Sequence, residues 1–220
     1  MKSASRTRLR PHFPRYALLA IALLFGVASI AARAEEGPDV TVKRVVEEVT
    51  AAINADKAVQ AGNREKITAL VDTKIVPHVD VEKMTQAAVG PNWAKATPEQ
   101  RQALMREFKR LVTNTYSGAF TGYRPDTKID YRPMRMGAGD STAVVRSVVT
   151  GSNGQQIPID YYLEKEGSEW KVVDFSVYNA RLVELYKGQF NSAINAGGID
   201  GLIKTLTAKN HANGDANSKS

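Results

Sequence analysis

The sequence has 220 residues, of which 43% are hydrophobic, and its formal net charge is +7. Six of the 30 basic residues and none of the 23 acidic residues lie at positions 1–34, which leaves 24 basic against 23 acidic residues, or +1, for the rest. That balance excludes the strongly basic surface typical of nucleic-acid-binding proteins, so we expect no nucleic acid as a partner. The absence of cysteine excludes disulfides, so packing alone must stabilise the fold.

The N-terminus has the pattern of a secretory signal peptide. Basic residues precede an apolar run at positions 17–32, and Ala32-Arg33-Ala34 fits the A-x-A pattern of a cleavage site. The run is short for a membrane-spanning helix, and a retained anchor is the alternative. We predict a cleaved signal peptide at residues 1–34, export to a bacterial periplasm and a mature protein that begins at about Glu35.

The first half of the mature chain predicts helices with short connections. Apolar residues recur at helical spacing in residues 40–61 and 64–71, and Asp80 can cap a further helix. The pattern of residues 97–123 predicts one long helix of about 35 Å that begins with a capping box of Thr97 and Gln100. Its apolar and aromatic stripe must face either the protein's own core or a ligand.

After Gly122 the pattern changes to alternating β-branched and aromatic residues. It predicts four strands, at residues 128–136, 141–150, 155–166 and 168–178, joined as an antiparallel meander. Pro158 indicates an edge strand or a bulge in the third strand. Helical spacing returns at Leu182 and is interrupted at Gly197-Gly198. We expect the tail at residues 209–220 to be disordered.

Helices, then strands, then helices favour an α+β fold. We predict a single domain at residues 35–208, with a four-stranded, antiparallel, curved sheet covered by a layer of helices. Periodicity does not distinguish a layer that packs solidly on the sheet from one that encloses an apolar cavity, so both remain open at this point.

The sequence lacks signatures of catalysis and of metal binding. His12 lies in the predicted signal and His211 in the predicted tail, and His78 alone cannot build a zinc site or a catalytic triad. Asp160 and Asp174, on neighbouring predicted strands, are the best candidates for a general base. They leave a small-molecule enzyme of a cone-shaped α+β fold, of the ketosteroid-isomerase kind, as an alternative.

Four segments resemble one known family in order and spacing: TPEQRQALMREFKRLVTNTY at 97–116, IPIDYYL at 157–163, WKVVDFSVYNARLVELYKGQF at 170–190 and GGIDGLIKTL at 197–206. They are similar to the MlaC family, also called the toluene-tolerance Ttg2D family, and the similarity spans about residues 40–206. The resemblance implies a periplasmic carrier rather than an enzyme, with no cofactor. Its cargo would be a phospholipid, with the acyl chains held in an apolar cavity between sheet and helices.

The resemblance also implies partners. They are an outer-membrane lipoprotein–porin complex of the MlaA type and an inner-membrane ABC transporter complex with an MlaD-type subunit. Shuttling phospholipid between them would maintain outer-membrane lipid asymmetry. From the apolar faces of the predicted elements, we expect fifteen residues to contact acyl chains: Leu104, Phe108, Leu111, Val112, Tyr116 and Phe120 from the long helix, Val145, Val149, Ile159, Tyr161, Phe175 and Val177 from the sheet, and Leu182, Tyr186 and Phe190 from the next helix.

Overall fold

The computed structural model describes residues 36–137 and 139–217, with side chains described to residue 213. The predicted signal peptide, residues 1–34, therefore lies outside the described residues. Within the described part of the chain, no helix is long and apolar enough to cross a membrane.

Five antiparallel strands of the described chain form one sheet. In sheet order they are β1 (Lys128–Tyr131), β2 (Thr142–Thr150), β3 (Gln156–Glu166), β4 (Glu169–Val177) and β5 (Ala180–Arg181). The first four correspond to the predicted strands, and β5 is too short for its sequence to show alternation. Tyr178 and Asn179, with φ of 51° and 63°, form the tight turn between β4 and β5. The sheet and its covering helices confirm the predicted α+β class.

Pro158 lies in the middle of the sheet, because β3 pairs with β2 on one side and with β4 on the other. The predicted edge position is therefore wrong, and the register shift in β3 falls at Tyr162/Leu163 instead. The Pro158 carbonyl accepts a hydrogen bond of 3.1 Å from the backbone N–H of Tyr178. Because N and C=O of a strand residue point the same way, the missing N–H of Pro158 faces the point where β4 ends, and the sheet tolerates it.

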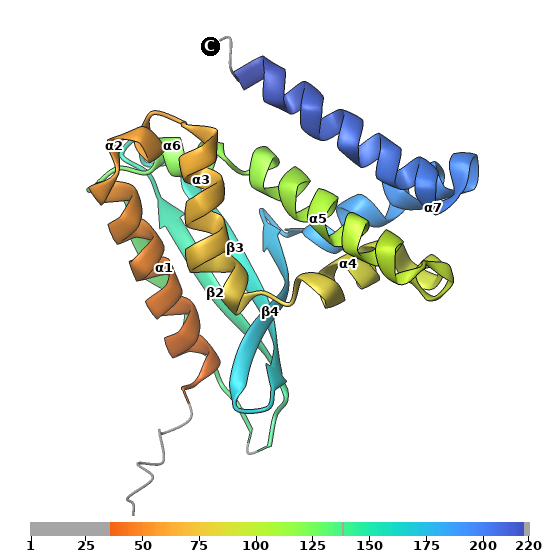
Figure 1. Ribbon diagram of the computed structural model, residues 1–220. Coiled ribbons are helices and arrows are strands. Elements are labelled where there is room, and N and C mark those ends of the chain that lie inside the picture. The colour runs from red at the N-terminus through yellow and green to blue at the C-terminus, as the bar shows by residue number, and fades with distance from the viewer. Residues whose placement is uncertain (1–35, 138, 218–220) are drawn as a thin grey trace, which may run out of the picture. The chain divides into compact units, whose positions relative to one another are not determined.

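Helices precede and follow the sheet. In chain order they are α1 (Pro38–Ala55), α2 (Lys57–Gln60), α3 (Arg64–Leu70), the π-helical turn η1 (Val71–Ile75), the 3₁₀ turn η2 (Val76–His78), α4 (Val81–Val89), the 3₁₀ turn η3 (Gly90–Lys95), α5 (Pro98–Thr115), α6 (Gly118–Gly122) and α7 (Leu182–Asn217). Asp56 divides the helix predicted at 40–61, because its Oδ1 accepts hydrogen bonds from the N–H groups of Ala58 and Val59 and starts α2. Figure 1 shows α1 alongside the long strands and α5 crossing towards α7.

The helix predicted at 97–123 is in fact two helices. The capping box is present as predicted, with the Thr97 side chain accepting from Gln100 N and the Gln100 side chain accepting from Thr97 N. However, α5 ends at Thr115 and is about 27 Å long. Thr115 and Ser117 donate side-chain hydrogen bonds to backbone carbonyls three or four residues earlier, and Gly118 follows. Such bonds compete with regular helix geometry, so the chain reorients before α6.

α7 is bent at Gly197 and Gly198, where the sequence predicts an interruption, and the φ of Gly198 is +69°. The helix then continues to Asn217, so residues 209–217 are helical, whereas composition predicts a disordered tail. Asn210 provides the physical reason. It is fully buried, and its Nδ2 donates to the backbone carbonyl and to Oε2 of Glu107 on α5, each at 3.0 Å. Residues 218–220 lie outside the described residues.

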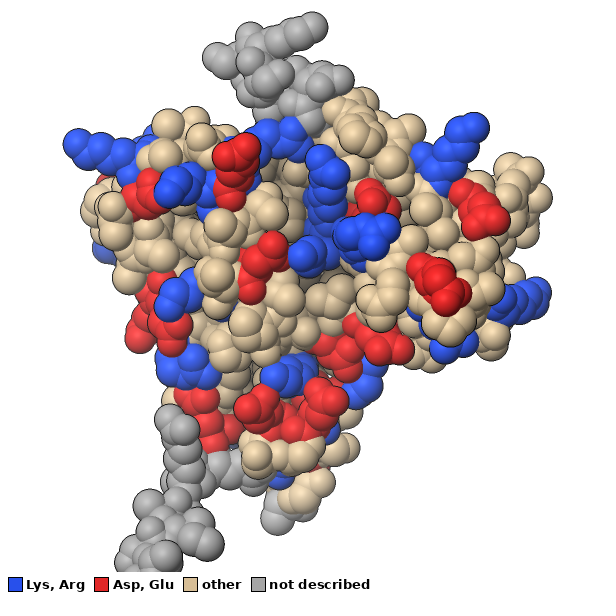
Figure 2. All heavy atoms as spheres, viewed as in Figure 1, with Lys and Arg blue, Asp and Glu red and all other residues tan. Residues whose placement is uncertain are grey.

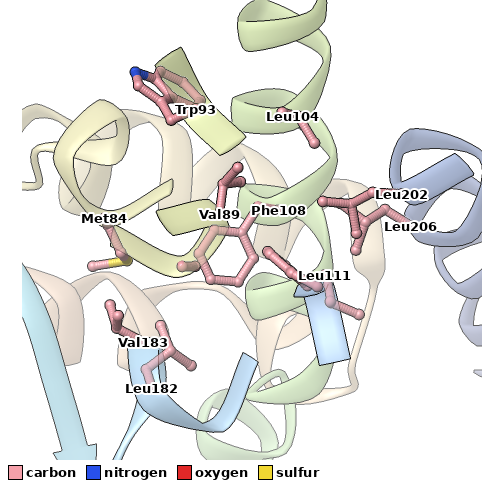
Figure 3. Packing of buried hydrophobic residues seen from close by; sticks show 12 residues of the cluster. Met84, Val89, Trp93, Leu104, Phe108, Leu111, Leu182, Val183, Leu202 and Leu206 are labelled. Carbon is pink, nitrogen blue, oxygen red and sulfur yellow. The ribbon is translucent and has the colours of Figure 1, made fainter. Parts of the chain in front are cut away.

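Among the described residues, three apolar clusters stabilise the domain. Cluster 1 joins α4, α5 and α7 (Figure 3) and includes Leu104, Phe108, Leu111, Leu182, Phe190, Leu202 and Leu206. Cluster 2 joins α1, α2, α3, η1 and α6 through Ile53, Val59, Ile67, Leu70, Val71 and Phe120. Cluster 3 packs the N-terminal part of α1 on the sheet through Val42, Ala143, Val145, Leu163 and Trp170. The three clusters leave a space among them, which is the candidate site.

Candidate functional site: an apolar cavity

A cavity of about 930 Å³ lies among the three clusters. It is bounded by the sheet on one side and by α1, η1, α5 and α6 on the others. Ligand pockets commonly measure about 300–1,000 Å³, so this one is at the large end of the range. Most of the side chains in its wall are aliphatic or aromatic.

The face of the sheet that the helices cover is packed at one end and hollow at the other. Val145 lies opposite Tyr161 in the ladder, and Val149 lies opposite Ile157, so all four side chains point to the same face. Val145 is only 2% exposed and packs in cluster 3. Val149, four residues further along β2, lies in the cavity wall. The same strand alternation therefore produces core at one end and cavity at the other.

The structure brings nine of the fifteen expected residues together in the cavity wall. They are Phe108, Val112, Tyr116, Phe120, Val149, Ile159, Tyr161, Phe175 and Val177. The other six lie outside the wall: Leu104, Leu111, Leu182, Tyr186 and Phe190 pack in cluster 1, and Val145 packs in cluster 3. The five in cluster 1 lie on apolar faces of α5 and α7 that pack together, and helical periodicity marks such a face in the same way as a face that lines a cavity.

Much of the wall absent from the sequence prediction comes from α1 and η1. Val45, Val46 and Val49 of α1 line the cavity, as do Val71 and Ile75 of η1. The valine stripe of α1 is visible in the sequence, but such a stripe more often indicates ordinary core. π-Helical turns often occur at functional sites, although nothing in the sequence of η1 predicts one.

The charged side chains of the wall are basic. Lys109 and Arg124 line the cavity, whereas no Asp or Glu occurs among the described residues that do so. His78, also in the wall, is half-buried, and burial is the main reason that its pKa lies below 6.5. Its imidazole is therefore neutral near pH 7.

Two tyrosines add hydroxyl groups to the wall without adding charge. Burial raises the pKa of both Tyr116 and Tyr161 above the usual value of 10.0, so both phenols remain protonated at neutral pH. The interior of the cavity is therefore uncharged and mostly apolar.

Neither candidate base lies in the cavity wall. Asp174 is 1% exposed, and its carboxylate accepts two backbone hydrogen bonds and an ion pair of 2.8 Å from Arg181 Nε. Asp160 lies 3.9 Å from Arg146 Nε. The described residues contain no group of three or more His, Asp or Glu that could hold a metal ion. Asp174 thus ties β4 to β5 and to the start of α7, and its lone pairs are already engaged.

The cavity opens to solvent, so its apolar wall remains in contact with water when no ligand fills it. Apolar surface left in water costs about 25 cal/mol per Å² relative to the same surface covered, so a ligand that covers the wall is stabilising. Ordered water needs several polar partners, and the interior offers few. The geometry therefore indicates a site for a large apolar ligand.

Comparisons with known proteins identify chains similar to this one. The family model described as MlaC protein matches residues 43–208. The toluene tolerance protein ttg2D of Pseudomonas putida is 30% identical over 193 residues, which cover 87% of each chain. The solved structure of a phospholipid-binding protein from Ralstonia solanacearum, in complex with a phospholipid, has a TM-score of 0.76 and 40% sequence identity; the match covers 80% of this chain and 98% of that chain.

Proposed function

The chain belongs to the MlaC family, and from this premise we propose that it is a periplasmic phospholipid carrier that holds acyl chains in its cavity and leaves the head group in water. The observation that carries the proposal is the apolar cavity of about 930 Å³ between the sheet and α1, η1, α5 and α6. The phospholipid complex of the relative from Ralstonia solanacearum supports it.

The apolar wall can supply the binding free energy without specific polar contacts. Two acyl chains have about thirty methylenes, and each is worth about 0.8 kcal/mol when it is removed from water. Much of that total offsets the ordering of the chains and of the lipid as a whole. Burying a charged phosphate without partners would cost far more than it returns, so the head group stays at the edge of the cavity.

The carrier works between two membrane complexes. One is an outer-membrane lipoprotein–porin complex of the MlaA type, and the other is an inner-membrane ABC transporter complex with an MlaD-type subunit. Transfer of phospholipid between them maintains the lipid asymmetry of the outer membrane. Family membership supports this role, and the sequence of residues 1–34 supports the periplasmic location.

Binding fits the structure better than the enzyme alternative does. An enzyme of the ketosteroid-isomerase kind needs its base to face the ligand. Asp174 is turned away into hydrogen bonds with β4, β5 and α7, and Asp160 also lies outside the wall. Among the described residues, the cavity wall therefore offers apolar contact to a ligand but no carboxylate to act on it.

Lipid analysis of the purified protein tests the proposal. Protein released from the periplasm without detergent should start at about Glu35 and contain two-chain phospholipid, identified by extraction and mass spectrometry. After delipidation, it should take up phospholipid from one vesicle population and deliver it to another. A protein that purifies empty and takes up no phospholipid would refute the carrier function, and recovery in membranes with Met1 intact would refute the location.

A further inference from the structure

Two cationic side chains, Lys109 and Arg124, lie in the described cavity wall, and they are bound differently. Arg124 donates from Nη1 to the carbonyl oxygens of Thr121 and Tyr123, at 2.6 and 2.9 Å, and so caps the end of α6. Lys109 instead extends from α5, and its Nζ lies 2.6 Å from Oδ1 of Asp72 on η1. Its ammonium group is the one that can exchange partners without unfolding a turn.

The Lys109–Asp72 pair lies at the boundary between cavity and solvent. The Lys109 side chain is 31% exposed and that of Asp72 is 41% exposed. On either side of Lys109, Phe108 and Val112 belong to the apolar wall, so the lysine stem lies along hydrocarbon while its ammonium group reaches water. Ion pairs this exposed contribute little to stability, so a competing anion can displace Asp72 at low cost.

The Lys109–Asp72 ion pair also spans the boundary between cluster 1 and cluster 2. Phe108 packs in cluster 1 with α7, whereas Val71 packs in cluster 2 with α1 and α6. Polar side chains span this boundary at two places. Lys109 pairs with Asp72, and Arg64 Nη2 donates a hydrogen bond of 2.9 Å to Asn114 Oδ1. In Figure 2, Lys and Arg side chains gather over α3 and α5 beside a hollow in the surface. This combination of a surface hollow, a basic rim and an adjoining apolar wall suits an amphiphile with a negatively charged head.

We propose that Lys109 binds the anionic head-group phosphate of the cargo lipid and exchanges its ion pair with Asp72 for one with the phosphodiester. This assignment rests on the proposed carrier function and adds a polar contact to it. In the empty protein, Asp72 holds the ammonium group at the rim, which keeps a cation out of the apolar interior. In the loaded protein, the phosphate takes the place of Asp72. The exchange predicts opposite effects for the two residues, because Asp72 competes with the lipid and Lys109 attracts it.

Binding measurements with two matched lipids test the exchange. The probes are phosphatidylglycerol and diacylglycerol with the same palmitoyl and oleoyl chains, each competing with a fluorescent lipid for the delipidated protein. Lys109→Met keeps an apolar stem and should weaken phosphatidylglycerol binding about threefold to tenfold, whereas Asp72→Asn should strengthen it about twofold to fivefold. Diacylglycerol binding should stay within about twofold in both variants. Lys74→Met is the control, because Lys74 is also on η1 and paired with a carboxylate, Glu48, but lies outside the cavity wall.

The outcomes distinguish the proposed ion-pair exchange at Lys109 from the proposed carrier function on which it rests. If Lys109→Met and Asp72→Asn change the affinity for phosphatidylglycerol equally and in the same direction, the ion pair only holds α5 and η1 together, and the proposed exchange is overturned. An unchanged preference for phosphatidylglycerol over diacylglycerol in Lys109→Met would also overturn it. Binding of inorganic phosphate at Lys109 as tight as that of phosphatidylglycerol would do the same, because the site would then not depend on the acyl chains. If the unmodified protein binds neither lipid, the carrier function itself falls with it.

Discussion

Two variants, Val145→Glu and Val149→Glu, test whether one end of the covered sheet face is solid core while the other end lines the cavity. Val145 is 2% exposed in cluster 3. Its replacement forfeits about 1.5 kcal/mol of apolar burial. Keeping the new carboxyl group neutral at pH 7, against its usual pKa of about 4.3, costs about 3.7 kcal/mol, and an unpaired polar group adds about 1–3 kcal/mol. The loss exceeds about 5 kcal/mol and approaches the whole stability of an ordinary domain. We expect Val145→Glu to unfold the protein.

Val149→Glu should have a different effect, because Val149 faces the cavity. Once the lipid has left, water can enter and hydrate the carboxylate, so we expect a loss of stability of no more than about 2 kcal/mol. Acyl chains, however, must expel that water. If the carboxyl group has to become neutral for this, the same cost of about 3.7 kcal/mol lowers lipid retention by up to about 500-fold.

Thermal melts followed by circular dichroism, together with the ratio of phospholipid to protein measured by mass spectrometry, distinguish the two effects. Val148→Glu is the matched control, since Val148 is next to Val149 but points to the opposite face of the sheet. It should stay folded and keep its lipid, with a loss of at most about 1 kcal/mol because Asp130 lies directly opposite on β1. The reasoning is refuted if Val149→Glu unfolds as readily as Val145→Glu, or if it stays folded and keeps a normal amount of lipid.

Two further predictions concern stability. Phe108 is 1% exposed and lies edge-on to Tyr186 and Phe190, with ring centroids 5.2 and 5.1 Å apart, so Phe108→Ala should cost about 3–5 kcal/mol in urea unfolding; a loss below about 1 kcal/mol would contradict this packing. For His78, burial holds the folded-state pKa below 6.5, so the unfolded state binds the proton more readily, and stability present above pH 6.5 is lost as the pH falls below it. Melting temperatures between about pH 7 and pH 5.5 should fall more steeply for the unmodified protein than for His78→Gln, and equal slopes would count against this linkage.

Local signals in the sequence predict the elements well where backbone chemistry decides them. The capping box at Thr97 and Gln100, the N-cap at Asp80 and the break at Gly197-Gly198 all act through neighbouring residues, and each is present in the structure. Where distant contacts decide, the same approach fails. The helicity of residues 209–217 depends on Asn210 reaching Glu107, which is 103 positions away in the sequence, and composition carries no trace of that contact.

The cavity wall is harder to predict than the fold, because side chains of one kind serve both core and cavity. Val145 and Val149 have the same residue type, strand and face, yet only Val149 borders the cavity. The difference arises from where α1 approaches the sheet, since Val42 fills the space above one end. Periodicity describes a single element, whereas a cavity depends on the separation of two elements.

The residues that pack outside the cavity explain how a hollow domain keeps its shape. α5 presents Phe108 and Val112 to the cavity, while Leu104 and Leu111 hold its other side against cluster 1. The edge-on ring contacts behind the wall are worth about 0.5–1.5 kcal/mol each beyond their buried area. On the opposite side, the hydrogen-bonded ladder fixes the strands. A wall anchored from behind resists collapse when the cavity empties, so apolar residues fall into two classes. Substitutions of residues that lie only behind the wall, such as Leu104 and Leu111, should change the melting temperature, whereas substitutions of residues that lie only on its inner surface, such as Val149, should mainly change the lipid content. Phe108 belongs to both the wall and cluster 1, so its substitution should change both.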